Sequence, residues 1–174
     1  DEWRASYGRI YRAVIEAGVN SVMLGHISLP AYSDKEDKAL PASLSKSLIT
    51  DLLKNELGFE GIVVTDALNM GGFAGWYNTH EESEIEALKA GCDMLLWPSE
   101  DYISNAVKAV NSGYIPTERI DDAVRRILTV KEKMGLLDDD YSYFTDITDD
   151  EKAFVKSVQE ACSNESITLI KNDL

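Results

Sequence analysis

The chain has 174 residues, of which 44% are hydrophobic and 28% charged, a composition typical of a globular protein with one hydrophobic core. Its formal net charge of −14 argues against a nucleic-acid partner and is compatible with a small or neutral substrate. No run approaches the ~18 consecutive apolar residues of a membrane span. The 2 cysteines and 2 histidines lack the spacing of a zinc site, so we expect no metal and no cofactor.

The pattern of apolar residues predicts helices that alternate with short buried strands. Ser45 and Thr117 are suitable helix caps, and glycines follow several helical segments. Strand–helix pairs of this length imply a parallel sheet with right-handed connections. The expected elements are, in order, a helix over 3–15, a strand over 21–25, a long loop over 28–41, a helix over 45–57, a strand over 61–66, a long loop over 67–80, a helix over 81–90, a strand over 93–97, and helices over 100–112 and 117–135.

Asp66 stands at the end of the second predicted strand, after the short β-branched run Ile62-Val-Val64. In α/β proteins the carboxyl ends of parallel strands form the face on which active sites are built. Asp66 is therefore a candidate catalytic residue. The alternative is that its carboxylate only caps the turn that follows.

The chain is expected to contain parts of two domains. Acidic residues bracket an aromatic stretch after Leu137, which indicates a linker, and a helix over 150–162 and a strand over 166–170 are expected after it. Three strands make an incomplete sheet, whereas a closed (β/α)8 barrel needs ~250 residues. A small, complete doubly wound domain is the alternative. Neither a starting methionine nor a signal peptide is present, so we interpret the chain as a piece of a longer protein, and cytoplasmic and secreted locations both stay open.

Four segments together resemble glycoside hydrolase family 3, whose catalytic domain is a TIM-like barrel followed by a second α/β domain. They are Ala17-Gly-Val-Asn-Ser-Val-Met-Leu-Gly-His26, Pro41-Ala-Ser-Leu-Ser45, Leu57-Gly-Phe-Glu-Gly-Ile-Val-Val-Thr-Asp-Ala-Leu-Asn-Met70 and Ala90-Gly-Cys-Asp-Met-Leu-Leu96. The resemblance implies an α/β fold in which residues 1–137 are the last three βα units of a partial TIM-type (β/α)8 barrel. Residues 138–174 would be a linker and the first helix and strand of the second domain.

The resemblance also implies an activity and a substrate. Asp66 would be the nucleophile of a retaining double-displacement mechanism. Family members that act on N-acetylglucosamine resemble the segment Asp66-Ala-Leu-Asn-Met70, whereas β-glucosidase-like members usually follow the nucleophile with tryptophan. We therefore expect a β-N-acetylhexosaminidase that cleaves terminal β-linked N-acetylglucosamine, with a β-glucosidase as the alternative.

Other residues are candidates for contact with the carbohydrate substrate. His26 ends the preceding strand and is a candidate sugar ligand or positioning group for Asp66; a histidine bonded to a loop carbonyl is the alternative. Met70 is a candidate for lining the pocket of the 2-acetamido group, or else a hydrophobic loop anchor. Trp76, Tyr77 and Trp97 are candidate stacking faces, although a core or subunit contact is the preferred interpretation for Trp97, which stands at a strand end.

The acid that protonates the leaving group is missing from the sequence. In the acetylglucosaminidase-like branch it resembles a His–Asp pair in a Lys-His-Phe-Pro-Gly-His-Gly type of motif, and neither His26 nor His80 lies in such a context. The isolated chain is therefore expected to be inactive without the remainder of the barrel and a C-terminal domain. An inactive, non-catalytic fragment stays an alternative. A phospho-acceptor receiver domain is disfavoured, because the first strand ends in Gly25-His26 and the third in Trp97-Pro98.

Overall fold

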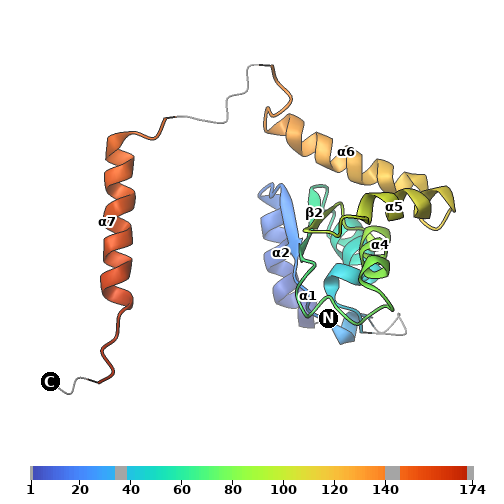
Figure 1. Cartoon of the computed structure of the whole chain (residues 1–174), viewed down its shortest axis with the longest axis horizontal. Helices are drawn as coiled ribbons and strands as arrows, with labels where there is room; N and C mark the ends of the chain where they lie inside the picture. Colours follow the sequence, from blue (N-terminus) through green and yellow to red (C-terminus); the bar gives the residue numbers. More distant parts are fainter. Residues whose placement is uncertain (1, 34–38, 140–145, 172–174) are drawn as a thin grey trace. The chain divides into compact units, whose positions relative to one another are not determined.

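Figure 1 shows the computed structural model of the chain, which describes residues 2–33, 39–139 and 146–171. The chain forms two compact units, Asp1–Leu137 and Asp138–Leu174, and each is described by itself. That these units are a portion of a barrel and the start of a second domain stays a prediction. The described elements of the first unit are α1 (Glu2–Ala5), α2 (Tyr7–Glu16), β1 (Ser21–Leu24), α3 (Pro30–Ser33), η1 (Ala42–Leu44), η2 (Ser47–Glu56), β2 (Ile62–Ala67), α4 (His80–Ala90), β3 (Met94–Leu96), α5 (Tyr102–Asn111) and α6 (Thr117–Lys133), and that of the second is α7 (Asp149–Ser166).

The three strands form one parallel sheet in the order β1-β2-β3, as the alternation of strands and helices predicted. Met23 of β1 lies opposite Val64 of β2, and Val64 lies opposite Met94 of β3. β2 is therefore the central strand of the described sheet. The α/β fold class is confirmed, and the parallel sheet with its flanking helices is consistent with a partial (β/α)8 barrel.

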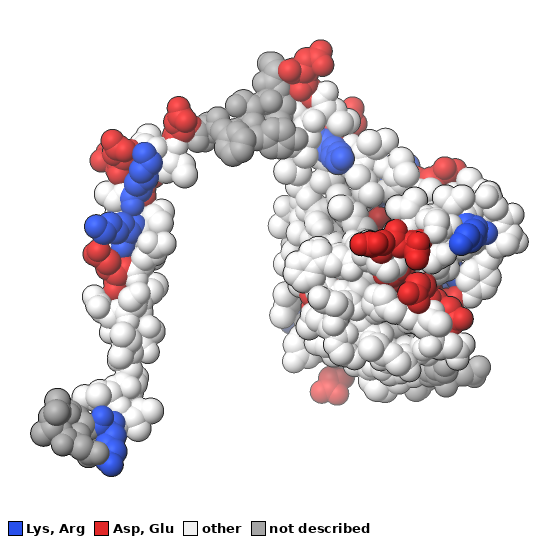
Figure 2. All heavy atoms as spheres, in the orientation of Figure 1, with Lys and Arg blue, Asp and Glu red and all other residues white. Residues whose placement is uncertain are grey.

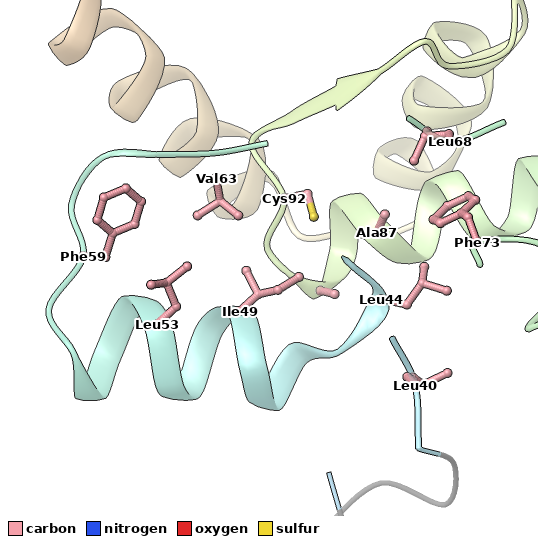
Figure 3. Packing of buried hydrophobic residues seen from close by; sticks show 11 residues of the cluster. Leu40, Leu44, Ile49, Leu53, Phe59, Val63, Leu68, Phe73, Ala87 and Cys92 are labelled. Atoms are coloured by element: carbon pink, nitrogen blue, oxygen red, sulfur yellow. The ribbon is translucent and has the colours of Figure 1, made fainter. Parts of the chain in front are cut away.

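The two faces of the sheet differ in burial. Val63 and Thr65 of β2 point to the helix-covered face and are fully buried. Figure 3 shows Ile49 and Leu53 of η2 pointing toward Val63, within a cluster that also contains Cys92. Burial raises the pKa of the Cys92 thiol to about 12, so this thiol is unreactive at neutral pH.

The opposite face of the sheet is open. Met23 is 59% exposed and Met94 is 45% exposed, although both lie within strands. In a closed barrel, side chains on this face fill the interior in layers. Met23 therefore lies on the uncovered side of the described sheet, outside its core.

Several helix ends differ from the predicted ones. The first predicted helix is two helices, because the backbone of Ser6 leaves the helical region and its hydroxyl bonds to the carbonyl of Glu2 at 2.7 Å. Ser45 caps η2 as expected, accepting the Leu48 N–H at 3.3 Å, and Gly58 after the helix has a φ of 70°. Thr117 is the first helical residue after Pro116 and makes no capping bond, so its prediction as a cap is wrong.

The last predicted strand is absent from the described residues. α7 begins after Thr148, which forms a reciprocal capping box with Glu151, and continues to Ser166. Residues 167–171 have no regular structure, and Ile167 and Leu169 are exposed. A strand is stable only beside partner strands, and no partner lies within the described part of this unit.

A buried ionic network connects η2, β3 and α6 at the N-terminal ends of β2 and β3. Asp93 accepts bonds from Lys54 at 2.8 Å, from Arg119 at 2.6 Å and from the Val63 N–H at 2.9 Å. Asp122 of α6 also binds Lys54, at 3.2 Å. Burial would raise the pKa of Asp122, but the neighbouring cations outweigh it and lower the pKa to about 2. The network therefore fixes the start of β3 against α6.

The surplus of acidic residues lies at the surface. Figure 2 shows acidic side chains gathered on the visible face of the first unit. Within the ranges that the structure describes, no group of His, Cys, Asp or Glu side chains is arranged to hold a metal ion. The helices among these residues also lack the length and hydropathy needed to cross a membrane. The acidic face favours a neutral or cationic ligand over a polyanion.

Candidate active site

Asp66 is the penultimate residue of β2, at the C-terminal end of the central strand and half-buried. Val64 pairs with Met94 and Ala67 pairs with Leu96, so β2 has one more residue than β3 between these pairs. This β-bulge contains Asp66. Bulges next to active sites redirect a side chain that regular alternation would place elsewhere.

The carboxylate of Asp66 is held by one oxygen. Its Oδ1 accepts the N–H of Ala67 at 2.7 Å, and no hydrogen bond or ion pair holds Oδ2 among the described residues. The predicted alternative was a carboxylate that only caps the following turn. The bond to Ala67 is of this kind, but it engages only one of the two oxygens. The other is available to an incoming ligand. A hydrogen-bonded carboxylate with one free oxygen suits a nucleophile, because the bond stabilises its charge without occupying the attacking atom.

His26 links three segments around this carboxylate. Its Nδ1 lies 2.7 Å from the hydroxyl of Ser43, and its Nε2 lies 3.0 Å from the carbonyl oxygen of Ala67. A carbonyl oxygen only accepts hydrogen bonds, so Nε2 carries the proton in either charge state of the ring. The predicted alternative was a bond to a loop carbonyl, and the observed carbonyl is that of Ala67, the last residue of β2. Both ring nitrogens are occupied within the chain, and the bonded carbonyl belongs to Ala67, the residue after Asp66.

The loop after β2 is anchored by Phe73 and not by Met70. Phe73 is fully buried and its ring lies 5.2 Å from that of His26. Met70 is 47% exposed, and its N–H closes a turn on the carbonyl of Ala67 at 3.1 Å. The side chain of Met70 is therefore accessible to a ligand at this end of the sheet. Its predicted contact with a sugar stays a prediction.

The three aromatic candidates have different environments. Trp76 and Tyr77 pack against the main hydrophobic cluster, and the indole N–H of Trp76 donates to the carbonyl of Gly72 at 3.1 Å. Trp97, immediately after β3, is 66% exposed. A core or subunit contact was expected for Trp97. Its exposure excludes core packing within the described chain, and the subunit contact stays a prediction.

Glu84 is a residue of this region that the sequence analysis did not identify. Its side chain is fully buried in α4 and accepts the N–H and the hydroxyl of Ser99, both at 2.6 Å. The Nε2 of His80 lies 3.3 Å from the same carboxylate. Glu84 thus anchors the loop that follows β3. A single glutamate in an acidic helix carries no sequence signal for this role, since its partner is 15 residues away.

Gly72 provides a test of the packing around His26. A Cβ at this position would lie 2.9 Å from the Cβ of His26, whereas a Cβ at Gly71 would meet nothing within 4 Å. We expect Gly72→Ala to displace His26 and to lower kcat of any reaction that uses Asp66 by about tenfold or more, since small misplacements at a site are costly. Gly71→Ala is the matched control and should retain kcat within about twofold. Steady-state kinetics of both variants would measure this difference. Equal kcat values for the two variants would show that the close contact between Gly72 and His26 does not position the site.

Comparison with known proteins identifies the family. The profile described as "Glycosyl hydrolase family 3 N terminal domain" matches residues 1–130. The chain belongs to glycoside hydrolase family 3. It is 40% identical over 145 residues to the "Beta-N-acetylglucosaminidase/beta-glucosidase" of Cellulomonas fimi, covering 78% of this chain and 25% of that protein. It is 32% identical over 174 residues to the "Periplasmic beta-glucosidase" of Salmonella typhimurium, covering 94% of this chain and 21% of that protein.

Solved structures agree with this assignment. The family 3 β-N-acetylglucosaminidase of Paenibacillus sp. is 32% identical, with a TM-score of 0.70 over 86% of this chain and 30% of that one. The β-glucoside phosphorylase BglX bound to 2FGlc is 30% identical, with a TM-score of 0.76 over 100% of this chain and 33% of that one. The predicted family is confirmed. The chain spans a quarter or less of the two curated relatives named above, which are larger proteins.

Proposed function

We propose that this chain is the part of a retaining family 3 glycosidase that provides its nucleophile, Asp66. The observation that carries the proposal is the placement of Asp66 at the C-terminal end of the central parallel strand, in a bulge and with one carboxylate oxygen free. This is the end of the strands at which (β/α)8 enzymes carry their catalytic groups. Membership of a glycoside hydrolase family supports glycosidic-bond hydrolysis as the reaction.

The proposed reaction has two displacements. The free carboxylate oxygen of Asp66 attacks the anomeric carbon, the bond from that carbon to the leaving oxygen breaks, and an acid protonates the leaving oxygen. Water then attacks the anomeric carbon of the glycosyl-enzyme and releases Asp66 as a carboxylate. We assign the acid to the remainder of the barrel, because the Lys-His-Phe-Pro-Gly-His-Gly type of motif that carries it in similar enzymes is missing from this sequence. The isolated chain is accordingly inactive in this proposal.

His26 and Met70 are proposed to complete the nucleophile's surroundings. His26 acts mainly by holding the carbonyl of Ala67, the residue after Asp66, because both of its ring nitrogens are bonded within the chain. Met70 is exposed one turn beyond Asp66 and is proposed to contact the substituent at C2 of the sugar. An apolar, unbranched side chain fits the methyl group of a 2-acetamido substituent.

The proposed substrate is a terminal β-linked N-acetylglucosamine residue. Ala67 after the nucleophile and the exposed Met70 favour the acetylated sugar, and one relative named above has both activities in its name. A β-glucosidase is the second candidate, supported by the relative named for that activity alone. Because one similar structure is of a phosphorylase, the assays should be run with and without phosphate as the acceptor.

Covalent trapping tests nucleophile and sugar together. The intact enzyme is incubated in parallel with 5-fluoro-N-acetylglucosaminyl fluoride and with 2-deoxy-2-fluoroglucosyl fluoride, and the labelled peptide is located by mass spectrometry. We expect the label on Asp66, and faster labelling by the N-acetylated sugar. Faster labelling by the glucosyl compound would favour the β-glucosidase. A label on another residue, or none from either compound, would overturn the proposed mechanism.

A further inference from the structure

Trp97 has an unusual backbone conformation at the end of β3. Its φ is 57°, and among the described residues it is the only non-glycine with a positive φ. Bulky L-residues avoid this region, and the following Pro98 further disfavours a helical backbone at the residue before it. Conformations of this kind persist where the surrounding structure enforces them and are concentrated at functional sites.

The indole of Trp97 has no structural role in the described chain. It is 66% exposed and makes no hydrogen bond or ring contact within the residues described. Trp76, on the loop after β2, is by contrast packed and hydrogen-bonded. The strain at Trp97 therefore presents an aromatic face to the surface without contributing to the core.

The segment around Trp97 is fixed on both sides. Before it, the N–H of Leu96 donates to the hydroxyl of Thr65 at 3.0 Å, which ties β3 to β2. After it, Ser99 donates two bonds of 2.6 Å to the buried carboxylate of Glu84. The indole is thus held out by a short segment anchored at both ends, as a rigid binding site requires.

Trp97 and Asp66 are neighbours across the sheet. Leu96 lies opposite Ala67, so each of the two residues is one position away from the same cross-strand pair. Neighbouring strands are ~4.8 Å apart and residues rise by ~3.3 Å along a strand. Trp97 lies one residue beyond this pair and Asp66 one residue before it, so their backbone positions are roughly 8 Å apart. This separation is longer than one sugar ring and suits a contact with the sugar next to the one that Asp66 attacks.

We propose that Trp97 is the stacking platform for the leaving-group sugar of the substrate. The inference rests on the proposed function, in which Asp66 bonds to the anomeric carbon of the terminal sugar. The leaving group extends from that carbon toward solvent, where the exposed indole stands. The apolar face of a pyranose ring packs on an aromatic ring, and rigid exposed aromatics are efficient anchors for such contacts.

The trapped glycosyl-enzyme isolates this contact, because it has lost its leaving group. Reactivation by water needs no sugar beyond Asp66, whereas reactivation by transfer to added N-acetylglucosamine needs the acceptor to occupy the leaving-group position. In the intact enzyme we expect Trp97→Ala to leave reactivation by water within about twofold of the wild-type rate. Reactivation by subsaturating acceptor should fall by about five- to tenfold, as expected for one lost aromatic contact. Trp97→Phe, which keeps a ring, should restore most of the acceptor rate.

Trp97→Gly separates a binding role from a structural one. Glycine adopts a positive φ freely, so this variant should melt at or above the temperature of Trp97→Ala while showing the same loss of acceptor reactivation. An unchanged acceptor rate in Trp97→Ala would overturn the proposal, as would an equal loss with water and with acceptor. Failure to trap the wild-type enzyme would also overturn the assignment of Asp66 as the nucleophile. Successful trapping together with normal acceptor transfer in Trp97→Ala would overturn only the role proposed for Trp97.

Discussion

Asp66→Asn is expected to lower kcat of the intact enzyme by on the order of 10⁴-fold or more, the scale on which loss of a nucleophilic residue acts in hydrolases. The amide is a poor nucleophile and forms no stable glycosyl ester, so the first displacement fails. Stability should change little, because Asp66 makes no ion pair and its described hydrogen bond is to the neighbouring Ala67 N–H, which an amide oxygen also accepts. Steady-state kinetics with an aryl glycoside and thermal unfolding provide the two measurements.

Asp51→Asn is the matched control for this variant. Asp51 is exposed on η2, and its substitution removes the same charge at a distance from the strand ends. We expect its kcat to equal that of the wild-type enzyme. If Asp66→Asn retained more than about a tenth of the wild-type kcat while Asp51→Asn was normal, the nucleophile would have to be another residue.

The sequence predicted the parts of the fold that depend on local patterns. The β-branched run around Val63 and the apolar run before Trp97 were identified as strands, and the helix stop at Gly58 was placed correctly. These features depend on periodicity and on backbone preferences, which a few neighbouring residues determine. The strand predicted at 166–170 was wrong in the described chain, because apolar β-branched residues form a strand only when a partner edge is present.

The details of the candidate site were less accessible. The position of Asp66 followed from the strand in which it lies. The bulge that holds it depends on the pairing of β2 with β3, whose paired residues are 30 positions apart at Val64 and Met94 and 29 apart at Ala67 and Leu96. The bonds of His26 to Ser43 and Ala67 likewise connect segments that only the tertiary fold brings together. Sequence patterns therefore indicated which residues belong to the site. They did not indicate which of them contact one another.

Asp93→Ala is expected to cost about 3–5 kcal/mol of unfolding free energy, the largest effect on stability that we predict. Lys54 and Arg119 are 5% and 10% exposed, and both bind Asp93. Removing the carboxylate would leave two nearly buried cations to share Asp122 and would deprive the Val63 N–H of its acceptor. Urea denaturation of the intact enzyme, followed by circular dichroism, would measure the loss.

Arg125→Ala is the control for the ionic network. Arg125 also binds Asp122 but is 61% exposed, so its removal should cost only ~0–1 kcal/mol. A loss below about 1 kcal/mol for Asp93→Ala would contradict the structural role assigned to the buried network. Because the network lies at the N-terminal ends of the strands and Asp66 at the C-terminal end of β2, the folded fraction of Asp93→Ala should retain kcat. The residues that govern stability and catalysis would then lie at opposite ends of the sheet, as expected for a (β/α)8 barrel.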